Sequence, residues 1–297
     1  MRKVKVITDS CSDLTPDILE KYNMDYARMA TLLDCEATPA LLEWSREEAH
    51  AFYDSMRDGN RITTSQATAE EFRRIFPLWL DQGYDIVYIG CSLKQSGSVN
   101  TGKMVAEELA PSYPDAKIHC IDSMNASCGE GILAIEAAKL AADGKPADEI
   151  AEHIVSIRKT VNQYVTVHTL DYLRRAGRVT ASSAFFGNLI GVKPVIISDA
   201  DGVQAAVKKV KGRQNSIREI VAMLKESIVA PEEQTVFIAH ADCSDEEVEA
   251  LRSAVLEEIP CKDVHVGCIG PIIGASIGPE ALALFAFGKE VTFRIGK

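Results

Sequence analysis

The sequence lacks any long hydrophobic run, and no stretch approaches the ~20 apolar residues that cross a bilayer. The apolar stretch at residues 4–7 is too short for a signal peptide. An excess of positive charge is lacking as well, because 32 Lys and Arg stand against 43 Asp and Glu, for a formal net charge of -11. We therefore expect a cytoplasmic protein that has no stable membrane insertion and binds no nucleic acid.

The eight cysteines lack a Cys-x-x-Cys pair and any regular spacing. We therefore predict reduced thiols instead of a disulfide framework, and no structural zinc site. His240, Asp242 and Cys243 are possible metal ligands, but they stand too close along one strand end to converge well on an ion. The sequence predicts neither a metal nor a cofactor.

Nucleotide-binding and hydrolase motifs are lacking or incomplete. There is no P-loop, and Gly129-x-Gly131 is too short a match to a dinucleotide fingerprint. Ser92 follows a strand and precedes a helix, as a nucleophile would, but the second glycine of Gly-x-Ser-x-Gly is missing. His240 and Asp242 would complete a triad only by distant convergence. A serine-dependent acyl-ester hydrolase that uses Ser92 stays an alternative.

What is present is the composition of a globular protein, with 297 residues, 46% of them apolar and 25% charged. The first half alternates helical patterns with apolar runs typical of strands, at residues 4–7, 29–33, 86–89 and 117–121. Such alternation is typical of a parallel sheet with helices on both faces.

The second half changes character. A strand-turn-strand pattern around residues 199–202 predicts a hairpin, residues 270–279 predict a loop, and residues 291–295 predict a last strand. We therefore predict two α/β domains with the ligand in the cleft between them. Residues 1–160 form a largely parallel sheet flanked by helices, and residues 161–297 form a mixed sheet with helices.

Helix starts are marked by hydroxyl residues. Ser45 precedes Glu48 by three positions, and Thr68 precedes Glu71 by three, which is the spacing of a capping box. Ser244 is a further expected cap. These residues predict three helix N-termini.

The first half contains four polar segments rich in hydroxyls, at residues 8–13, 62–66, 90–98 and 122–131. We predict that the four segments converge at the same end of the sheet. In open α/β sheets, ligands collect where strands end and helices begin, because N–H groups and the helix dipole favour an anion there. We predict that the central segment, 90–98, holds the anionic head of a small ligand. A plain helix cap is the simpler interpretation of residues 8–13.

A carboxylate could accept hydrogen bonds from Thr64, Ser92 and nearby backbone N–H groups, each worth ~1.5–3 kcal/mol. A buried alkyl tail gains ~0.8 kcal/mol per methylene, so a long chain would dominate affinity. A different small anion, such as a phosphorylated metabolite, is an alternative ligand. Ordinary core positions are the simpler interpretation of each apolar residue that could wall a tunnel for the tail. These tunnel candidates are Phe185, Phe186, Leu189, Ile190, Ile272, Ile273 and Ile277.

Several motifs occur jointly and in a fixed order along the chain. The shorter ones are Ile7-Thr8-Asp9-Ser10, Thr64-Ser65-Gln66, Ser96-Gly97 and Asp122-Ser123. The most specific ones are Leu170-Asp171-Tyr172-Leu173-Arg174-Arg175-Ala176-Gly177-Arg178, Gly191-Val192-Lys193-Pro194 and Ile269-Gly270-Pro271-Ile272-Ile273-Gly274. With these motifs the sequence resembles the DegV family of bacterial fatty-acid-binding proteins along nearly its whole length.

The resemblance implies a two-domain α/β protein that buries one long-chain fatty acid. It implies that Thr64 and Ser92 hold the carboxylate, together with Ser96 and Gly97 of the central segment. The supporting network that it implies consists of Thr8, Ser10, Ser65, Arg178 and Ser276.

The resemblance also implies a partner, because members of the family present the acid to a separate ATP-dependent fatty-acid kinase that makes an acyl phosphate for phospholipid synthesis. The chain would then be a carrier without a catalytic nucleophile. It departs from the family pattern at Leu93 or Cys91, where a second serine is usual, at Ser276, where a histidine is usual, and at Lys211, where an arginine is common. These departures concern the head-group network and kinase coupling more than acyl-chain binding.

Overall fold

The computed structural model describes residues 2–181 and 191–296. Its chain divides into two units, the first made of residues 1–43 and 64–158 and the second of residues 44–63 and 159–297. Both units are α/β, as predicted. The sequence predicts a single division near residue 160, whereas the segment 44–63 also belongs to the second unit.

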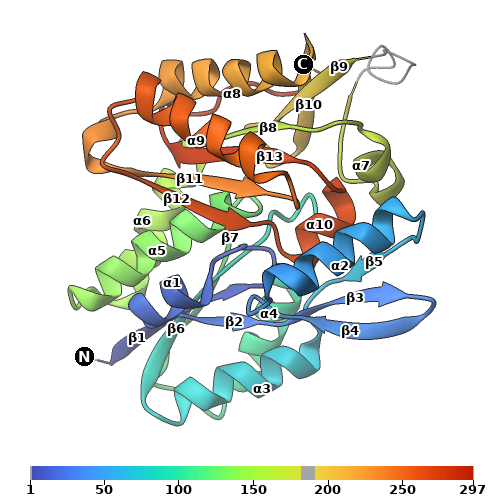
Figure 1. The fold of residues 1–297 in the computed structure, drawn as a ribbon. Coiled ribbons are helices and arrows are strands. Elements are labelled where there is room, and N and C mark those ends of the chain that lie inside the picture. The colour runs from blue at the N-terminus through green and yellow to red at the C-terminus, as the bar shows by residue number, and fades with distance from the viewer. Residues whose placement is uncertain (1, 182–190, 297) are drawn as a thin grey trace. The chain divides into compact units, whose positions relative to one another are not determined.

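The first unit is built around a four-stranded sheet in which all strands run parallel. Its order is β2 (Asp25–Ala27), β1 (Lys3–Asp9), β6 (Tyr84–Gly90) and β7 (Ile118–Asp122). Its helices are α1 (Pro16–Lys21), α3 (Ala69–Leu80), α4 (Ser98–Leu109), α5 (Cys128–Ala142) and α6 (Ala147–Ile157). The pair α3 and α4 packs on one face of the sheet, and the pair α5 and α6 covers the other (Figure 1).

The central strands are continuously apolar because helices cover both of their faces. Residues 86–89 are fully buried. Within this run the ring of Tyr88 lies 5.1 Å from that of Phe72 and 6.4 Å from that of Phe76, centroid to centroid, so α3 is fixed against β6. The expected strands at residues 4–7 and 117–121 are confirmed as β1 and β7.

A three-stranded sheet also belongs largely to this unit, with the order β4 (Glu36–Ala40), β3 (Met29–Leu33) and β5 (Thr63–Ser65). The pairing of β3 with β4 is antiparallel. The polar segment 62–66 therefore forms an edge strand of this second sheet. It does not follow a strand of the parallel sheet, as the other three polar segments do.

The second unit contains a mixed six-stranded sheet. Its order is β10 (Gln204–Lys211), β9 (Val192–Ser198), β8 (Val161–Thr166), β13 (Leu282–Phe287), β11 (Thr235–His240) and β12 (Asp263–Cys268). Its α-helices are α2 (Arg46–Arg57), α7 (Asp171–Ala176), α8 (Arg213–Ser227), α9 (Asp245–Glu258) and α10 (Pro271–Ile277), and two 3-10 turns are Arg158–Thr160 and Pro231–Glu233. The predicted hairpin is confirmed as the antiparallel pair β9 and β10.

The predicted caps are confirmed. The Ser45 hydroxyl accepts a hydrogen bond from the Glu48 N–H at 3.1 Å, and the Glu48 carboxylate accepts one from the Ser45 N–H at 2.7 Å. The Thr68 hydroxyl caps α3 by accepting from the Glu71 N–H, whereas the Glu71 carboxylate accepts from the Arg28 N–H and does not complete a capping box. Ser244 caps α9. The positions of these three hydroxyl residues therefore predicted three helix N-termini correctly.

Two predictions near the C-terminus are wrong. Within the predicted loop 270–279, residues Pro271–Ile277 form helix α10. Pro271 stands at the first helical position and Gly278 ends the helix with a φ of 81°, so neither residue interrupts it. The last strand is β13 and not residues 291–295. Since β13 lies between two strands and is buried, its apolar run does not alternate.

Candidate functional site

Three of the four polar segments meet at one edge of the parallel sheet, whereas all four were expected to converge there. The strands β1, β6 and β7 end at Asp9, Gly90 and Asp122, and Gly90 pairs with Asp122 in the ladder. Parallel strands deliver their carboxyl ends to a common edge. We call the segments that follow these three strand ends, residues 9–13, 90–98 and 122–130, the polar edge.

The central segment is a turn held by its own backbone. The N–H of Ser92 donates to the carbonyl of Asn125 at 2.8 Å, and the Ser92 carbonyl accepts from the N–H groups of Gln95 and Ser96 at 2.8 and 2.9 Å. The Ser92 hydroxyl accepts from the Lys94 N–H at 3.2 Å, and Ser92 is fully buried. The hydroxyl of Ser92 is therefore placed by rigid backbone.

The Thr64 motif is tied to this segment by two hydrogen bonds. The Ser98 hydroxyl accepts from the Ala67 N–H at 3.1 Å, and the Gln66 amide donates to the Thr101 hydroxyl at 2.8 Å. The Ser96 and Ser98 hydroxyls lie 3.0 Å apart. Two motifs that the sequence left separate are thus brought side by side at the start of α4.

Gly97 lies against the Gln66 side chain. It is the N-cap of α4, and a Cβ atom added to it would overlap the side-chain oxygen of Gln66. Because Gly97 offers no side chain for capping, the N–H groups of the first turn of α4 are not capped by it. Thr64 and Ser65 are half-buried on the neighbouring strand β5.

The two hydroxyls predicted at the end of β1 are engaged within the first unit. Thr8 donates to the Glu130 carboxylate at 2.6 Å. Ser10 donates to the Ala40 carbonyl at 2.6 Å and accepts from the Met29 N–H at 3.0 Å, so it joins the parallel sheet to the smaller sheet. Both hydroxyls hold the polar edge together.

The remaining predicted residues belong to the second unit. Arg178 is exposed and donates to the Ala176 carbonyl at 2.8 Å, just after the left-handed Gly177 that ends α7. Ser276 is half-buried in α10. Of the tunnel candidates, Ile272 and Ile277 are buried and Ile273 is half-buried in the same helix, whereas Phe185, Phe186, Leu189 and Ile190 lie outside the described residues.

The sequence did not predict that two acids of the polar edge, Asp9 and Glu130, are buried close together. Asp9 is fully buried and accepts hydrogen bonds from the Tyr88 hydroxyl at 2.7 Å and from the Cys11 N–H at 2.8 Å. The Asp9 N–H donates to Glu130 at 3.3 Å. Burial raises the pKa of Asp9 and raises that of Glu130 well above its ordinary value. Thr8 and Glu130 stand 122 positions apart, so no local pattern could reveal them.

Left-handed backbone also marks the polar edge. Asp13, Met124 and Ser127 have φ values of 50°, 57° and 55°, which residues other than glycine rarely adopt. The Ser127 hydroxyl donates to the Asp13 carboxylate at 2.5 Å, so two of these residues hold each other. Such conformations persist where the surrounding structure fixes them, and they concentrate at binding sites.

The DegV family model, described as one of uncharacterised proteins, matches residues 3–289. The chain belongs to the DegV family. A DegV domain-containing protein of Clostridium perfringens is 34% identical over 288 residues, which cover 97% of this chain and 98% of that protein. One from Streptococcus pyogenes is 30% identical over 286 residues, with 96% and 98% covered.

Solved structures of DegV proteins share the fold. A DegV family protein from Thermus thermophilus, described by its fatty-acid binding, matches with a TM-score of 0.86 at 24% identity and covers 97% of this chain and 100% of that one. DegV from Bacillus subtilis, described as a fatty-acid-binding protein, matches with a TM-score of 0.83 at 22% identity, with 97% and 100% covered. The two-unit α/β architecture is therefore that of the DegV family. Among residues 2–181 and 191–296, no helix is long and apolar enough to cross a membrane.

Proposed function

We propose that this DegV protein binds one long-chain fatty acid, whose carboxylate accepts hydrogen bonds from Thr64 and Ser92. The observation that carries the proposal is the attachment of the Thr64 motif to the central segment through the bonds from Gln66 to Thr101 and from Ala67 to Ser98. It supports two hydroxyl-bearing segments acting on one ligand. The DegV proteins from T. thermophilus and B. subtilis are both described as binding fatty acid.

The start of α4 suits a carboxylate. A helix of 12 residues presents N–H groups and the positive end of its dipole at its first turn. Ser96 and Gly97 stand at this turn and complete the proposed head-group site. Hydrogen bonds to a charged group are worth ~1.5–3 kcal/mol each, so the head group orients the ligand while the tail supplies most of the affinity.

The acyl chain would contact apolar residues of the second unit. Ile272, Ile273 and Ile277 stand together on α10, and Ser276 is on the same helix. We propose these residues, with Phe185, Phe186, Leu189 and Ile190, as the walls of the acyl tunnel. Arg178, Thr8, Ser10 and Ser65 support the head-group site.

The protein would act as a carrier that presents the acid to a separate fatty-acid kinase, and it would have no catalytic nucleophile. The Ser92 hydroxyl accepts from the Lys94 backbone N–H, and in the proposed site it would donate to the carboxylate and would not attack an ester. Turnover of a chromogenic acyl ester by the purified protein, abolished by Ser92→Ala, would instead support a hydrolase.

The double variant Thr64→Val/Ser92→Ala tests the head-group site. Loss of two charge-assisted bonds should weaken retention of a supplied long-chain acid at least tenfold. The measurement is the dissociation constant from fluorescence competition with a labelled fatty acid.

A matched control is Thr63→Val/Ser112→Ala, because Thr63 is the exposed neighbour of Thr64 in β5 and Ser112 is exposed. The control should bind as the unaltered protein does. Equal affinity of the double variant and the control would refute the assignment of Thr64 and Ser92.

A further inference from the structure

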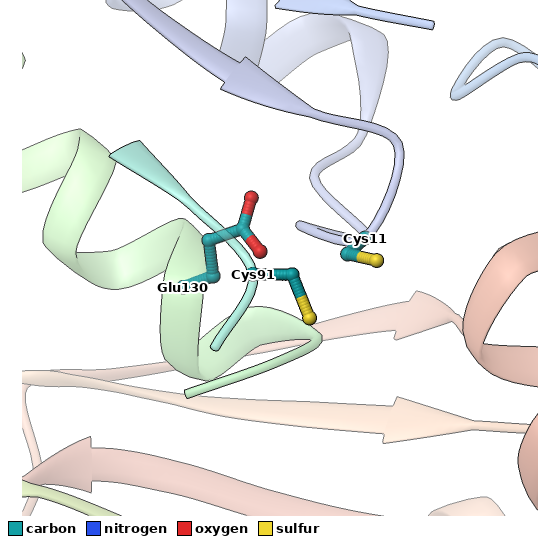
Figure 2. Close-up of side chains that lie close together, drawn as sticks. All are labelled: Cys11, Cys91 and Glu130. Carbon is teal, nitrogen blue, oxygen red and sulfur yellow. The ribbon is translucent and has the colours of Figure 1, made fainter. Parts of the chain in front are cut away.

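We propose that Cys11, Cys91 and Glu130 form a binding site for a thiophilic divalent cation of the zinc group. The three side chains come from the ends of β1 and β6 and from the first turn of α5 (Figure 2). One ligand atom from each, the two Sγ atoms and a carboxylate oxygen, lies within 4.8 Å of the others. All three residues are buried, with exposed fractions of 2%, 1% and 0%.

The carboxylate of Glu130 supplies an independent reason to expect a cation. Its Oε1 accepts from the Thr8 hydroxyl and from the Asp9 N–H. Within residues 2–181 and 191–296, no hydrogen-bond donor reaches Oε2, although this atom is buried. A buried carboxylate oxygen without a partner costs free energy, and a cation bound by the Glu130 carboxylate would remove that cost.

The donor set selects the kind of ion. Two cysteine sulfurs are soft ligands that favour zinc or cadmium over magnesium or calcium. The Met29 thioether lies 3.5 Å from Cys11 Sγ and adds a second kind of soft sulfur. Zinc binds sulfur at about 2.3 Å and carboxylate oxygen at about 2.1 Å, so ligand atoms around one ion stand roughly 3.5–3.8 Å apart. The ligand atoms of the cluster lie within 4.8 Å of one another, so they would draw together by up to about 1 Å to bind an ion.

The surroundings hold these ligands in place. Thr8 and the Asp9 N–H orient the Glu130 carboxylate, and the Cys11 N–H donates to Asp9 at 2.8 Å. Such outer contacts are typical of metal sites. Two thiolates alone would balance the charge of a divalent ion, and the carboxylate would add one further negative charge. Since Cys91 directly precedes Ser92, a bound ion would fix the backbone that enters the central segment.

The test is a titration of the full chain with Cd²⁺ or Zn²⁺ alone, after treatment with a chelator and in a reductant that contains no sulfur. Competition with a chromophoric chelator gives affinity and stoichiometry, and the ultraviolet thiolate-to-cadmium absorbance reports sulfur ligation. We expect one tightly bound ion per chain with thiolate absorbance. Each of Cys11→Ser, Cys91→Ser and Glu130→Gln should weaken that binding at least tenfold.

Matched controls are Cys120→Ser in β7 and Cys268→Ser in β12, whose thiols stand outside the cluster. They should keep the full stoichiometry. Zinc should also raise the thermal unfolding temperature of the unaltered protein, but not that of folded Cys91→Ser, in which only sulfur is exchanged for oxygen. Absence of a stoichiometric thiolate-bound ion in the unaltered protein, or its retention in Cys11→Ser and Cys91→Ser, would overturn the proposal.

Discussion

The polar edge of the first unit and the apolar cluster of the second unit bury their side chains in opposite ways. The polar edge buries acids and hydroxyls, among them Asp9, Ser92 and Glu130. The apolar cluster lies under α8 and α9 and contains Ile220, Leu224, Leu251 and other aliphatic residues. Burial of apolar area stabilises a fold, whereas each buried polar group must find a partner to avoid a cost. The apolar cluster therefore stabilises the fold, whereas the polar edge contains buried polar groups that contribute less to stability and are available for binding.

Leu251→Ala should have the largest effect on stability among the substitutions that test this comparison. Leu251 is fully buried in the apolar cluster, so truncation should lower the free energy of unfolding by about 2–5 kcal/mol. Chemical denaturation measures the change. Leu256→Ala, on the exposed side of the same helix α9, should leave the stability nearly unchanged. Equal losses at the two positions would break the distinction between the apolar cluster and the surface.

Tyr88→Phe should have a smaller effect. It removes the hydroxyl that donates to Asp9 at 2.7 Å, and both residues are fully buried. The same carboxyl oxygen keeps the bond from the Cys91 N–H at 3.3 Å, so loss of the shorter bond should cost about 0.5–1.5 kcal/mol in the free energy of unfolding.

Tyr113 offers the matched control, because its hydroxyl donates to Asp81 at the same distance on the exposed surface. Tyr113→Phe should leave the stability nearly unchanged. If the two substitutions lowered the free energy of unfolding equally, burial would not make the hydrogen bond of the polar edge stronger than one at the surface.

The pH dependence of stability is the smallest expected effect. Burial raises the folded-state pKa of Glu130 and of Asp9. The pKa of the neighbouring Cys11 thiol is raised as well, mainly by its hydrogen bond with Cys91. An acid with a raised folded pKa contributes stability below its unfolded pKa, and that contribution is lost as pH rises through the folded pKa. The metal-free protein should therefore lose stability as pH rises from about 4.5, the ordinary pKa of a glutamate.

Glu130→Gln should reduce this loss, because glutamine does not ionise. The measurement is the unfolding free energy in urea at a series of pH values, in the presence of a chelator. A slope identical to that of the unaltered protein would show that Glu130 does not ionise differently in the two states.

Much of the fold could be predicted from the sequence because its determinants are local. Hydroxyl caps at Ser45, Thr68 and Ser244 and the apolar run of β6 each lie within a few residues. The predictions were wrong where the same residue type is favourable in two different structures. Proline and glycine around α10 suggested a loop, yet at the ends of a helix the same residues are favourable.

The candidate site could be predicted only in part. The sequence indicated that hydroxyl-rich segments meet at one sheet edge, and the parallel strands confirm it for three of them. It could not reveal the attachment of Gln66 to Thr101 or the pairing of Thr8 with Glu130, since long-range contacts leave no periodic signal. The cluster of Cys11, Cys91 and Glu130 could not be predicted for the same reason, because its three residues stand far apart in the sequence.

Mass spectrometry of the lipid extracted from the purified, denatured protein tests the central claim most directly. The account predicts close to one long-chain fatty acid per chain, and loss of that acid from Thr64→Val/Ser92→Ala but not from Thr63→Val/Ser112→Ala. Protein that carries a phosphorylated metabolite in place of an acyl chain, or that stays free of lipid after incubation with a long-chain acid, would contradict it.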